Sequence, residues 1–416
     1  MSYDYRLVRT LSRRAFLSAA TPLLAAADKK SLGQSTGRGT RFDGPASVSA
    51  DELTERLVYR LTPPDSLHHL PHYHHRFLSK RNSFALVASE RTGFGQIFRL
   101  DLPEADMLQL TEGPNIHSYS PTLDHKEKNF YFLQGNELKR ASVKKGRERL
   151  IYRTQSGWRM TGHLAISDRS RLAAVVEMRD EDWVEGFDEQ YAKKPRCRIQ
   201  LVDLRTGTGR LLVGENTWLA HPQFRPRSNE VLYCHEGPWD KVDARLWLMR
   251  LGAEGPKNLR PREGNERLGH EYWSGFGHEV CYVFYPDDTG RGATVRCVNV
   301  NTGKERVVSR CTRFGWLSAN DDNSVIVGAS SSLAGPNIYL LFSRLQREFT
   351  VCEHASSGKA YPIAGTEHSD PWASAPEPVF SSDSQWIYFV SDREGLPAIY
   401  RTAVPDLVEE TQRSET

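Results

Sequence analysis

One structural unit recurs along this chain, and the repeat limits the possible folds more than any other feature. In each copy a segment with Pro or His and an Asp or Asn turn leads into a short apolar strand. The clear copies begin at positions 121, 163, 222 and 378, and fainter copies begin near 77, 272 and 316. Seven copies at this spacing are typical of a β-propeller, in which each copy forms one four-stranded blade. The sequence therefore predicts an all-β fold, a seven-bladed β-propeller in a single domain.

Smaller patterns complete this prediction. Asp203 and Asn299 are each followed by a Thr-Gly pair, which indicates a tight turn between two strands of a blade. Residues 55–61 have a strand pattern without a blade of their own, so we predict that they close the last blade beside 398–403. No long helix is evident, and the charged insertion 180–195 is predicted to be partly helical and to overhang the pocket.

The N-terminus has the features of an export signal. SRRAFL at 12–17 has the twin-arginine form, and an apolar run ends in a small-residue cleavage site at 25–27. The run is too short to span a bilayer, so we expect no membrane anchor in the mature protein; a buried first helix is the alternative. We predict a bacterial protein exported to the periplasm or beyond, with a signal over 1–27, a flexible linker over 28–50, the propeller over 51–405 and a disordered tail over 406–416.

Composition excludes some classes of function. The net charge is +3, so bulk charge does not indicate a nucleic-acid partner. The chain has six cysteines, and none is in a C-x-x-C pair. Most lie in apolar strand patterns, and a twin-arginine substrate folds in a reducing cytoplasm, so we expect buried thiols and no obligatory disulfide.

The stretch 218–248 carries the densest group of reactive side chains. His221 precedes the first strand of a blade, which lines the central channel of a propeller, and His235 ends the next strand. A histidine at a strand end can titrate near neutral pH and suits a general base. Arg225 and Arg245 lie nearby, and a guanidinium group binds both oxygens of a carboxylate.

The same stretch resembles the oligogalacturonate lyases, the pectin-fragment lyases built on a seven-bladed β-propeller. Their patterns W-L-G-H-P, C-H-E-G-P and V-D-A-R-x-W correspond to WLAHP at 218–222, CHEGP at 234–238 and VDARLW at 242–247. Further matches are RLTPPD at 60–65, HEYW at 270–273 and GLPAIY at 395–400. The resemblance extends in order over residues 55–405.

The resemblance implies β-elimination on a uronate. A base removes the proton beside the carboxylate, the glycosidic oxygen leaves, and a cation neutralises the carboxylate. The resemblance implies His221 as the base and Arg198 as a substrate clamp, while position in the chain leaves His235 as a rival base. Arg225 and Arg245 are further candidate clamps, although Arg245 has Asp243 as a possible structural partner.

The resemblance also implies a divalent metal, Mn²⁺ or Ca²⁺, with His270 as one ligand. The family's other ligands come from Q-x-x-H-x-H-P-x-F, which reads WASAPEPVF at 372–380. Trp372 and Ala375 therefore replace a glutamine and a histidine, and Glu377 replaces the second histidine. A carboxylate suits both ions, so we predict His270 and Glu377 as ligands, with His368 as a further candidate.

Five histidines between positions 68 and 75 form a possible metal-binding tract. We expect His69 to face the axis of the propeller and bind substrate, and the others to lie in a surface loop.

The reduced ligand set leaves two alternatives to an oligogalacturonate-lyase-like enzyme. One is a non-catalytic propeller that binds an acidic oligosaccharide or a protein partner. The other is a lyase for another uronate polymer, in which arginines replace the metal.

Overall fold

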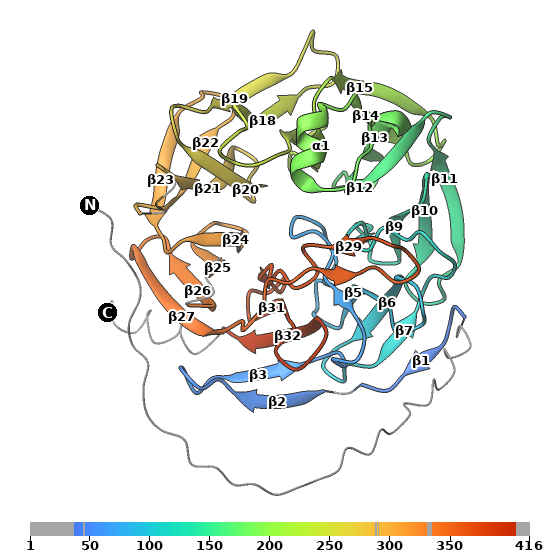
Figure 1. Ribbon diagram of the computed structural model, residues 1–416, viewed down its shortest axis with the longest axis vertical. Helices are drawn as coiled ribbons and strands as arrows, with labels where there is room; N and C mark the ends of the chain where they lie inside the picture. Colours follow the sequence, from blue (N-terminus) through green and yellow to red (C-terminus); the bar gives the residue numbers. More distant parts are fainter. Residues whose placement is uncertain (1–36, 45, 288, 290, 331–334, 405–416) are drawn as a thin grey trace, which may run out of the picture. The chain divides into compact units, whose positions relative to one another are not determined.

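The computed structural model describes residues 37–44, 46–287, 289, 291–330 and 335–404, so the predicted export signal and tail lie outside the described residues. Seven antiparallel sheets surround a common centre, which confirms the predicted seven-bladed propeller (Figure 1). Each blade has four strands, with its first strand nearest the axis.

The strands of the first four blades are β4 (His68–His69), β5 (Phe84–Ser89), β6 (Gln96–Asp101) and β7 (Met107–Gln109); β8 (Thr122–Leu123), β9 (Asn129–Gln134), β10 (Glu137–Ser142) and β11 (Glu148–Arg153); β12 (Trp158–Ile166), β13 (Leu172–Arg179), β14 (Cys197–Asp203) and β15 (Gly209–Glu215); and β16 (Leu219–Phe224), β17 (Val231–His235), β18 (Ala244–Met249) and β19 (Lys257–Pro261).

The remaining three blades follow the same plan. Their strands are β20 (Arg267–Trp273), β21 (Glu279–Tyr285), β22 (Thr294–Asn299) and β23 (Glu305–Arg310); β24 (Phe314–Ala319), β25 (Val325–Ser330), β26 (Asn337–Phe342) and β27 (Arg347–Glu353); and β30 (Val379–Phe380), β31 (Trp386–Ser391), β32 (Ala398–Ala403) and β3 (Leu57–Arg60). The predicted tight turns are confirmed, because the carboxylate of Asp203 and the side-chain oxygen of Asn299 each accept two backbone N–H bonds from the turn.

The ring is closed by the N-terminal part of the propeller, as predicted. β3 pairs with β32 of the last blade, with Val58 opposite Thr402. The predicted flexible linker is wrong in its described part, because β2 (Ser47–Ala50) pairs with β3 and β1 (Arg41–Phe42) pairs with β7. These short strands are held by backbone hydrogen bonds to an existing sheet edge, and a polar composition does not reveal such pairing.

Neighbouring blades pack their faces against each other, which explains why the second strand of a blade, such as β5, β13 or β31, is buried along nearly its whole length. Phe98, Phe130 and Tyr388 come from the first, second and seventh blades and share one buried cluster. The apolar core therefore continues across the ring closure. Burying each of these large side chains stabilises the fold by roughly 2 kcal/mol.

One pair of cysteines departs from the expectation of buried thiols. Cys281 and Cys297 form a disulfide between β21 and β22, where the antiparallel register places them directly opposite each other. Register is a property of the folded sheet, so their separation in sequence did not reveal the pair. Cys197, Cys234 and Cys352 are buried free thiols, as expected.

Two segments project over the centre of the propeller. The insertion between β13 and β14 contains the 3-10 helix η1 (Asp180–Asp182) and α1 (Phe187–Lys193), which confirms its partly helical character. The connection from β27 to β30 contains the hairpin β28 (Tyr361–Pro362) and β29 (Ser369–Asp370). His368 and Glu185 join the two segments by an ion pair of 2.9 Å. We call the end of the propeller that carries both segments the insertion face (Figure 1). No helix among the described residues is long and apolar enough to cross a membrane.

Candidate active site

An irregularity recurs in the inner strands and directs side chains to the axis. The pairing of β12, β16 and β20 with their neighbours is interrupted at Gly162, His221 and His270, where φ is 93°, 48° and 52°. Glu377, directly before β30, has φ 36°. A left-handed conformation costs about 1–2 kcal/mol for a residue with a Cβ atom. Such strain is concentrated at functional sites, so His221, His270 and Glu377 are candidate functional residues on structural grounds.

A group of histidines surrounds His221. The ring centroids of His72, His163 and His221 are 4.7–5.3 Å apart, and the His74 ring lies 5.8 Å from that of His221. We call His72, His74, His163 and His221 the axial histidine cluster. The expectation that the other histidines of the 68–75 tract lie in a surface loop is therefore wrong, because His72 and His74 lie against His221 and both His68 and His75 are buried.

Buried polar contacts hold the loop that follows β4 at the axis. His75 is 8% exposed and hydrogen-bonds through its two ring nitrogens to the carbonyl oxygens of Pro121 and Leu164, at 3.2 and 2.6 Å. The Tyr73 hydroxyl donates to the Glu271 carbonyl oxygen at 2.9 Å, and its ring lies 4.8 Å from that of His270. These contacts connect the first blade to the second, third and fifth, which explains why a polar loop is drawn into the centre.

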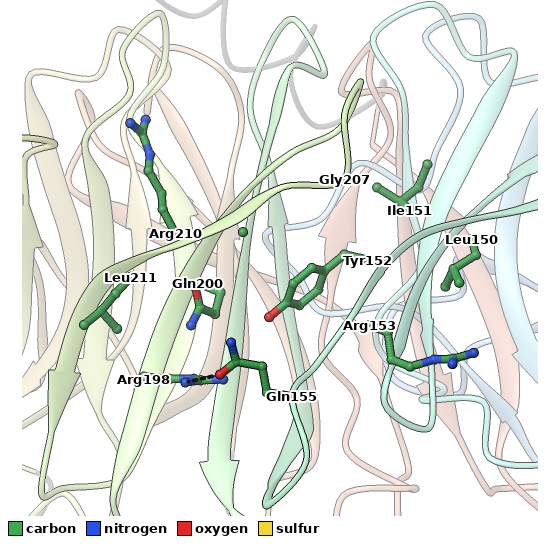
Figure 2. A pocket seen from close by; sticks show the side chains of 11 residues that line it. Leu150, Ile151, Tyr152, Arg153, Gln155, Arg198, Gln200, Gly207, Arg210 and Leu211 are labelled. Atoms are coloured by element: carbon green, nitrogen blue, oxygen red, sulfur yellow. Dashed lines mark hydrogen bonds between the residues drawn. The ribbon is translucent and has the colours of Figure 1, made fainter.

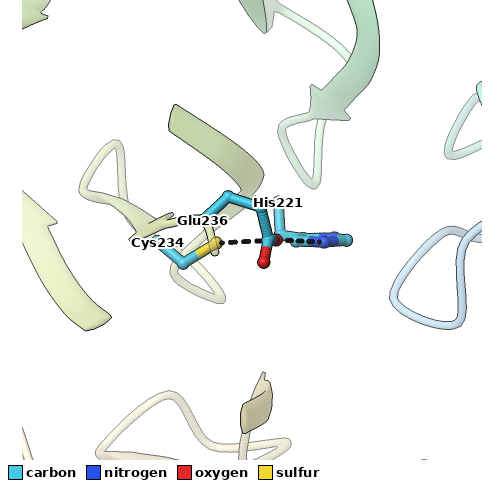
Figure 3. A group of neighbouring side chains, drawn as sticks. All are labelled: His221, Cys234 and Glu236. Carbon is cyan, nitrogen blue, oxygen red and sulfur yellow. Dashed lines mark hydrogen bonds and ion pairs between the residues drawn. The ribbon is translucent and has the colours of Figure 1, made fainter. Parts of the chain in front are cut away.

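His221 has the hydrogen bonds of a general base. Its Nε2 lies 3.1 Å from Oε2 of Glu236, and its Nδ1 is buried without a hydrogen-bond partner among the described residues. Figure 3 shows Glu236 between His221 and Cys234. A proton on Nε2 that is donated to Glu236 leaves a free lone pair on Nδ1. The carboxylate also stabilises the imidazolium ion that forms when Nδ1 takes up a proton.

Arg245 supports this pair rather than pairing with Asp243. It lies 3.0 Å from Glu236 and 3.0 Å from Glu271, whereas Asp243 contacts Arg262 at 3.1 Å. Burial opposes ionisation of Glu236, but Arg245 and His221 hold the pKa of this carboxyl well below its usual value. Arg245 is only 6% exposed, and its guanidinium is occupied by two carboxylates. It therefore positions Glu236 rather than presenting itself to a substrate.

Several donors for a metal lie around the axis. His270 has a buried Nδ1 without a hydrogen-bond partner in the described part of the chain, and burial lowers its pKa to about 3, so the imidazole is neutral. Burial raises the pKa of Glu377 to about 7. Both ring nitrogens of His74 are buried and lack partners within the described ranges. Unpaired buried imidazole nitrogens and a buried carboxylate are donor types that suit a divalent transition metal such as Mn²⁺, although the donor atoms of these three side chains do not all lie within 4.8 Å of one another.

Two other donor groups are less suitable. His221, Cys234 and Glu236 lie within 4.8 Å of one another, but Glu236 is engaged by Arg245. Glu279 lies beside Cys281 and Cys297, whose sulfurs form a disulfide and are not free thiolates.

Arg198 lies at the interface between the second and third blades. Its guanidinium is 2.6 Å from the buried carboxylate of Glu177 and covers the ring of Trp158 at 3.9 Å. It also lines an outer pocket of about 590 Å³ together with Gln155 and Arg210 (Figure 2). None of the contacts that the structure gives Arg198 involves the axial histidine cluster, so its role as a substrate clamp stays a prediction.

His235 and Arg225 also have partners away from the cluster. His235 binds Glu215 at 2.8 Å and stacks on Trp247 at 4.8 Å. Arg225 binds Glu230 at 2.6 Å. Both side chains stabilise the fourth blade, and this geometry favours His221 over His235 as the base.

His69 lies beside the axial histidine cluster, close to the insertion face. Its Nδ1 is 3.1 Å from the Tyr119 hydroxyl, which donates to Asp370 at 2.6 Å and whose ring stacks on that of His72 at 5.4 Å. His368, by contrast, pairs with Glu185 on the insertion.

Some axial residues were missed by sequence reasoning. His163 was noted only as the start of a blade repeat, and Arg159 was not considered. Arg159, near the start of β12, places its guanidinium 4.7 Å from the centroid of Trp183 and makes no ion pair within the described part of the chain. A lone arginine in a strand pattern carries no signal in sequence, because its neighbours come from a distant insertion.

Comparisons with known proteins show the family of this chain. A family model described as oligogalacturonate lyase matches residues 39–408. The chain is 30% identical over 380 residues to an oligogalacturonide lyase of Pectobacterium atrosepticum, covering 86% of this chain and 96% of that protein. It is 29% identical over 395 residues to an oligogalacturonate lyase of Dickeya dadantii, covering 89% and 99%.

Solved structures give the same result. An oligogalacturonate lyase in complex with manganese superposes with a TM-score of 0.84 at 28% identity, covering 90% of this chain and 100% of that one. An oligogalacturonate lyase from Vibrio parahaemolyticus superposes with a TM-score of 0.82 at 26% identity, covering 89% and 100%.

Proposed function

This chain belongs to the oligogalacturonate lyase family, and on that premise we propose that it cleaves short oligogalacturonides by β-elimination at the axial site. The proton at C5 is removed, its electron pair forms the C4–C5 double bond, and the C4–O bond breaks. The leaving oxygen is protonated by solvent. The products are a shortened saccharide and one with an unsaturated uronate end. The observation that carries this proposal is His221, held in a left-handed conformation with Nδ1 unpaired and Nε2 against Glu236.

The residues around His221 have separate roles in this reaction. His221 takes the C5 proton at Nδ1, Glu236 stabilises the resulting imidazolium, and Arg245 holds Glu236 in place. Arg198, carried over from the family resemblance, remains a proposed substrate clamp, and His69 a proposed substrate-binding residue. His235, Arg225 and Arg245 are not proposed to contact the substrate, because their side chains are engaged by carboxylates.

We propose His270 and Glu377 as ligands of a divalent metal ion. The donors fit such an ion, because His270 offers an unpaired neutral nitrogen and Glu377 a buried carboxylate. When bound, the ion supplies positive charge that neutralises the uronate carboxylate and stabilises the enolate. His74 offers the nitrogens that Ala375 lacks, so we include it as a third ligand. Manganese is the first candidate, because a similar lyase has been solved in complex with it.

An ultraviolet assay tests the proposal directly. Purified protein is incubated with saturated digalacturonate, and the absorbance of the conjugated double bond is followed with Mn²⁺, with Ca²⁺ and with a chelator. A rise that the chelator abolishes is the expected result. A rise that the chelator leaves unchanged indicates neutralisation by arginine alone. The absence of any rise in folded protein contradicts the proposed activity on digalacturonate.

Trp372 and Ala375 favour one second candidate, a propeller that binds an acidic oligosaccharide without cleaving it. In that case digalacturonate binds in calorimetry but gives no conjugated product with any metal. Other uronate oligosaccharides, tested in the same assay, examine the remaining alternative of a lyase for a different polymer.

We also propose that the protein is exported by its twin-arginine motif, and that the mature protein has no membrane anchor. The motif at 12–17 supports this proposal. Fractionation of cells that express the full chain, compared with an Arg13→Lys/Arg14→Lys variant, tests it. Loss of the periplasmic or secreted form in the variant is expected, and an unchanged distribution contradicts it.

A further inference from the structure

Aromatic side chains gather on the insertion face. The Phe187 ring lies 5.3 Å from Trp218 and 6.1 Å from Trp372, and the Trp183 ring lies 5.6 Å from His368. We call these five residues the aromatic rim. Trp183 is 41% exposed and Trp372 is 49% exposed. Large exposed aromatic side chains that gather at one place mark a binding surface.

The aromatic rim adjoins the axial site. The backbone N–H of Trp372 donates to Asp370 at 2.8 Å, and the other carboxylate oxygen of Asp370 accepts from Tyr119 at 2.6 Å. Tyr119 in turn contacts His69 and stacks on His72 of the axial histidine cluster. Asp370 and Tyr119 therefore connect the aromatic rim directly to the axial histidine cluster.

The rim also includes a cation suited to a uronate. Arg159 lies over Trp183 at 4.7 Å and has no carboxylate partner in the described ranges, unlike Arg196 and Arg198, which pair with Asp182 and Glu177. It lies on β12, the strand that also carries His163. A guanidinium group beside an aromatic ring offers an ion pair to a carboxylate and a flat apolar surface to the face of a sugar ring.

We propose that the aromatic rim is a sugar-binding subsite for a uronosyl residue beyond the two that flank the cleaved bond. Trp183 and Trp372 pack against the apolar face of the saccharide, and Arg159 binds its carboxylate. The inference rests on the proposed function and adds a preference for substrates of three or more uronosyl residues. Trp372 stands where the family pattern has a glutamine ligand, so a metal-binding position of the family has become part of the substrate surface.

The test compares chain lengths. Turnover of digalacturonate and trigalacturonate is measured for the unmodified protein and for Trp372→Ala, Trp183→Ala and Arg159→Gln. Each variant is expected to raise KM for the trisaccharide by about 5- to 10-fold, the size of one lost stacking or ionic contact. kcat and the KM for the disaccharide are expected to change little.

Two matched control variants test whether removing any exposed aromatic or arginine side chain changes KM in the same way. Phe276→Ala removes an aromatic side chain that is 62% exposed. Phe276 lies in the turn between β20 and β21. This turn is at the end of the propeller opposite the insertion face, because successive strands of a blade run in opposite directions. Arg171→Gln removes an exposed arginine from the turn between β12 and β13, at the same end of the propeller as Phe276. Both are expected to leave KM unchanged for either substrate.

Binding measurements make the outcome independent of catalysis. Calorimetric titration of trigalacturonate is carried out with His221→Ala alone and with His221→Ala/Trp372→Ala. Tighter binding of the trisaccharide than of the disaccharide, lost with Trp372, supports the subsite even if no turnover is found. Equal affinities for the two lengths, unaffected by Trp372, Trp183 and Arg159, overturn it while leaving the proposed lyase activity intact.

Discussion

The axial site and the outer pocket between the second and third blades are both polar, but they differ in residue type and in how their polar side chains are paired. The outer pocket, at about 590 Å³, is lined by arginines and glutamines, and its Arg198 is matched by the buried Glu177. At the axis, His74 and His270 have buried nitrogens without partners in the described part of the chain. An unpaired buried polar group costs about 1–3 kcal/mol. The comparison teaches that a group of unpaired buried imidazole nitrogens, rather than the size of a cavity, distinguishes the axial site from the outer pocket.

Among the variants that test the difference between the axial site and the outer pocket, replacing His221 is expected to have the largest effect. His221→Ala is expected to lower kcat by about 10³-fold, within the range of a general base. His235→Ala is the matched control, since it removes a histidine of the same blade whose ring contacts Glu215 and Trp247. Initial rates at saturating digalacturonate measure both. A loss in His235→Ala as large as that in His221→Ala contradicts the assignment.

Removing Arg245 tests the buried charges that support His221. Arg245→Met leaves Glu236 and Glu271 without their shared partner, and breaking a buried pair costs about 3–5 kcal/mol. Urea unfolding measures the loss. Arg198→Met affects one carboxylate, Glu177, which keeps the hydrogen bond from the Tyr152 hydroxyl at 2.9 Å, so a smaller loss is expected. A larger loss of unfolding free energy in Arg198→Met than in Arg245→Met shows that Arg198, not Arg245, is the structurally essential arginine.

Metal affinity separates the proposed ligands from other histidines. His270→Ala, Glu377→Ala and His74→Ala are each expected to weaken Mn²⁺ binding by about 10- to 100-fold, the usual cost of disturbing a metal site. Dialysed protein is titrated with Mn²⁺, and bound ion is measured by mass spectrometry. His354→Ala is the control, because His354 is buried on the sixth blade and bonds backbone groups. Unchanged affinity in His74→Ala removes His74 from the ligand set.

The smallest effect concerns acid stability. Burial lowers the pKa of His68 to about 3 and that of His354 to about 4. Between these values and the ordinary value of about 6.5 the unfolded chain binds more protons, so stability falls as pH drops through this window. His68→Gln and His354→Gln are each expected to reduce the loss of unfolding free energy by about 1 kcal/mol per pH unit. Melting temperatures measured from pH 7 to pH 5 test this expectation. An unchanged slope of melting temperature against pH in both variants contradicts the assignment of acid sensitivity to His68 and His354.

Much of the fold was predictable because a propeller repeats. The copies beginning at 121, 163, 222 and 378 each lead to a blade, and residues 55–61 supply the strand that closes the ring. The strands β1 and β2 and the disulfide Cys281–Cys297 were not predicted. Each depends on which strand edges meet in the folded chain, and composition does not report that.

The candidate site was predictable only in part. His221 and His270 came from a motif, and the structure places both at equivalent strand irregularities. His72 and His74 lie in the histidine tract that the sequence indicated as a possible metal site, but neither this tract nor the pattern around Arg159 showed which side chains surround them. Their neighbours lie in other blades or in the insertion, so only long-range contacts reveal their environment.

The sequence by itself determined the number of blades, the ring closure and the family, because periodic apolar strands and short motifs are local properties. Only the tertiary structure decided which polar side chains meet at the axis and which are already paired. Closing seven blades into a ring brings residues from both ends of the chain to one point and removes water from them. Once water is removed, a histidine without a hydrogen-bond partner costs free energy. The positions of such histidines therefore locate the site, and ring closure decides them.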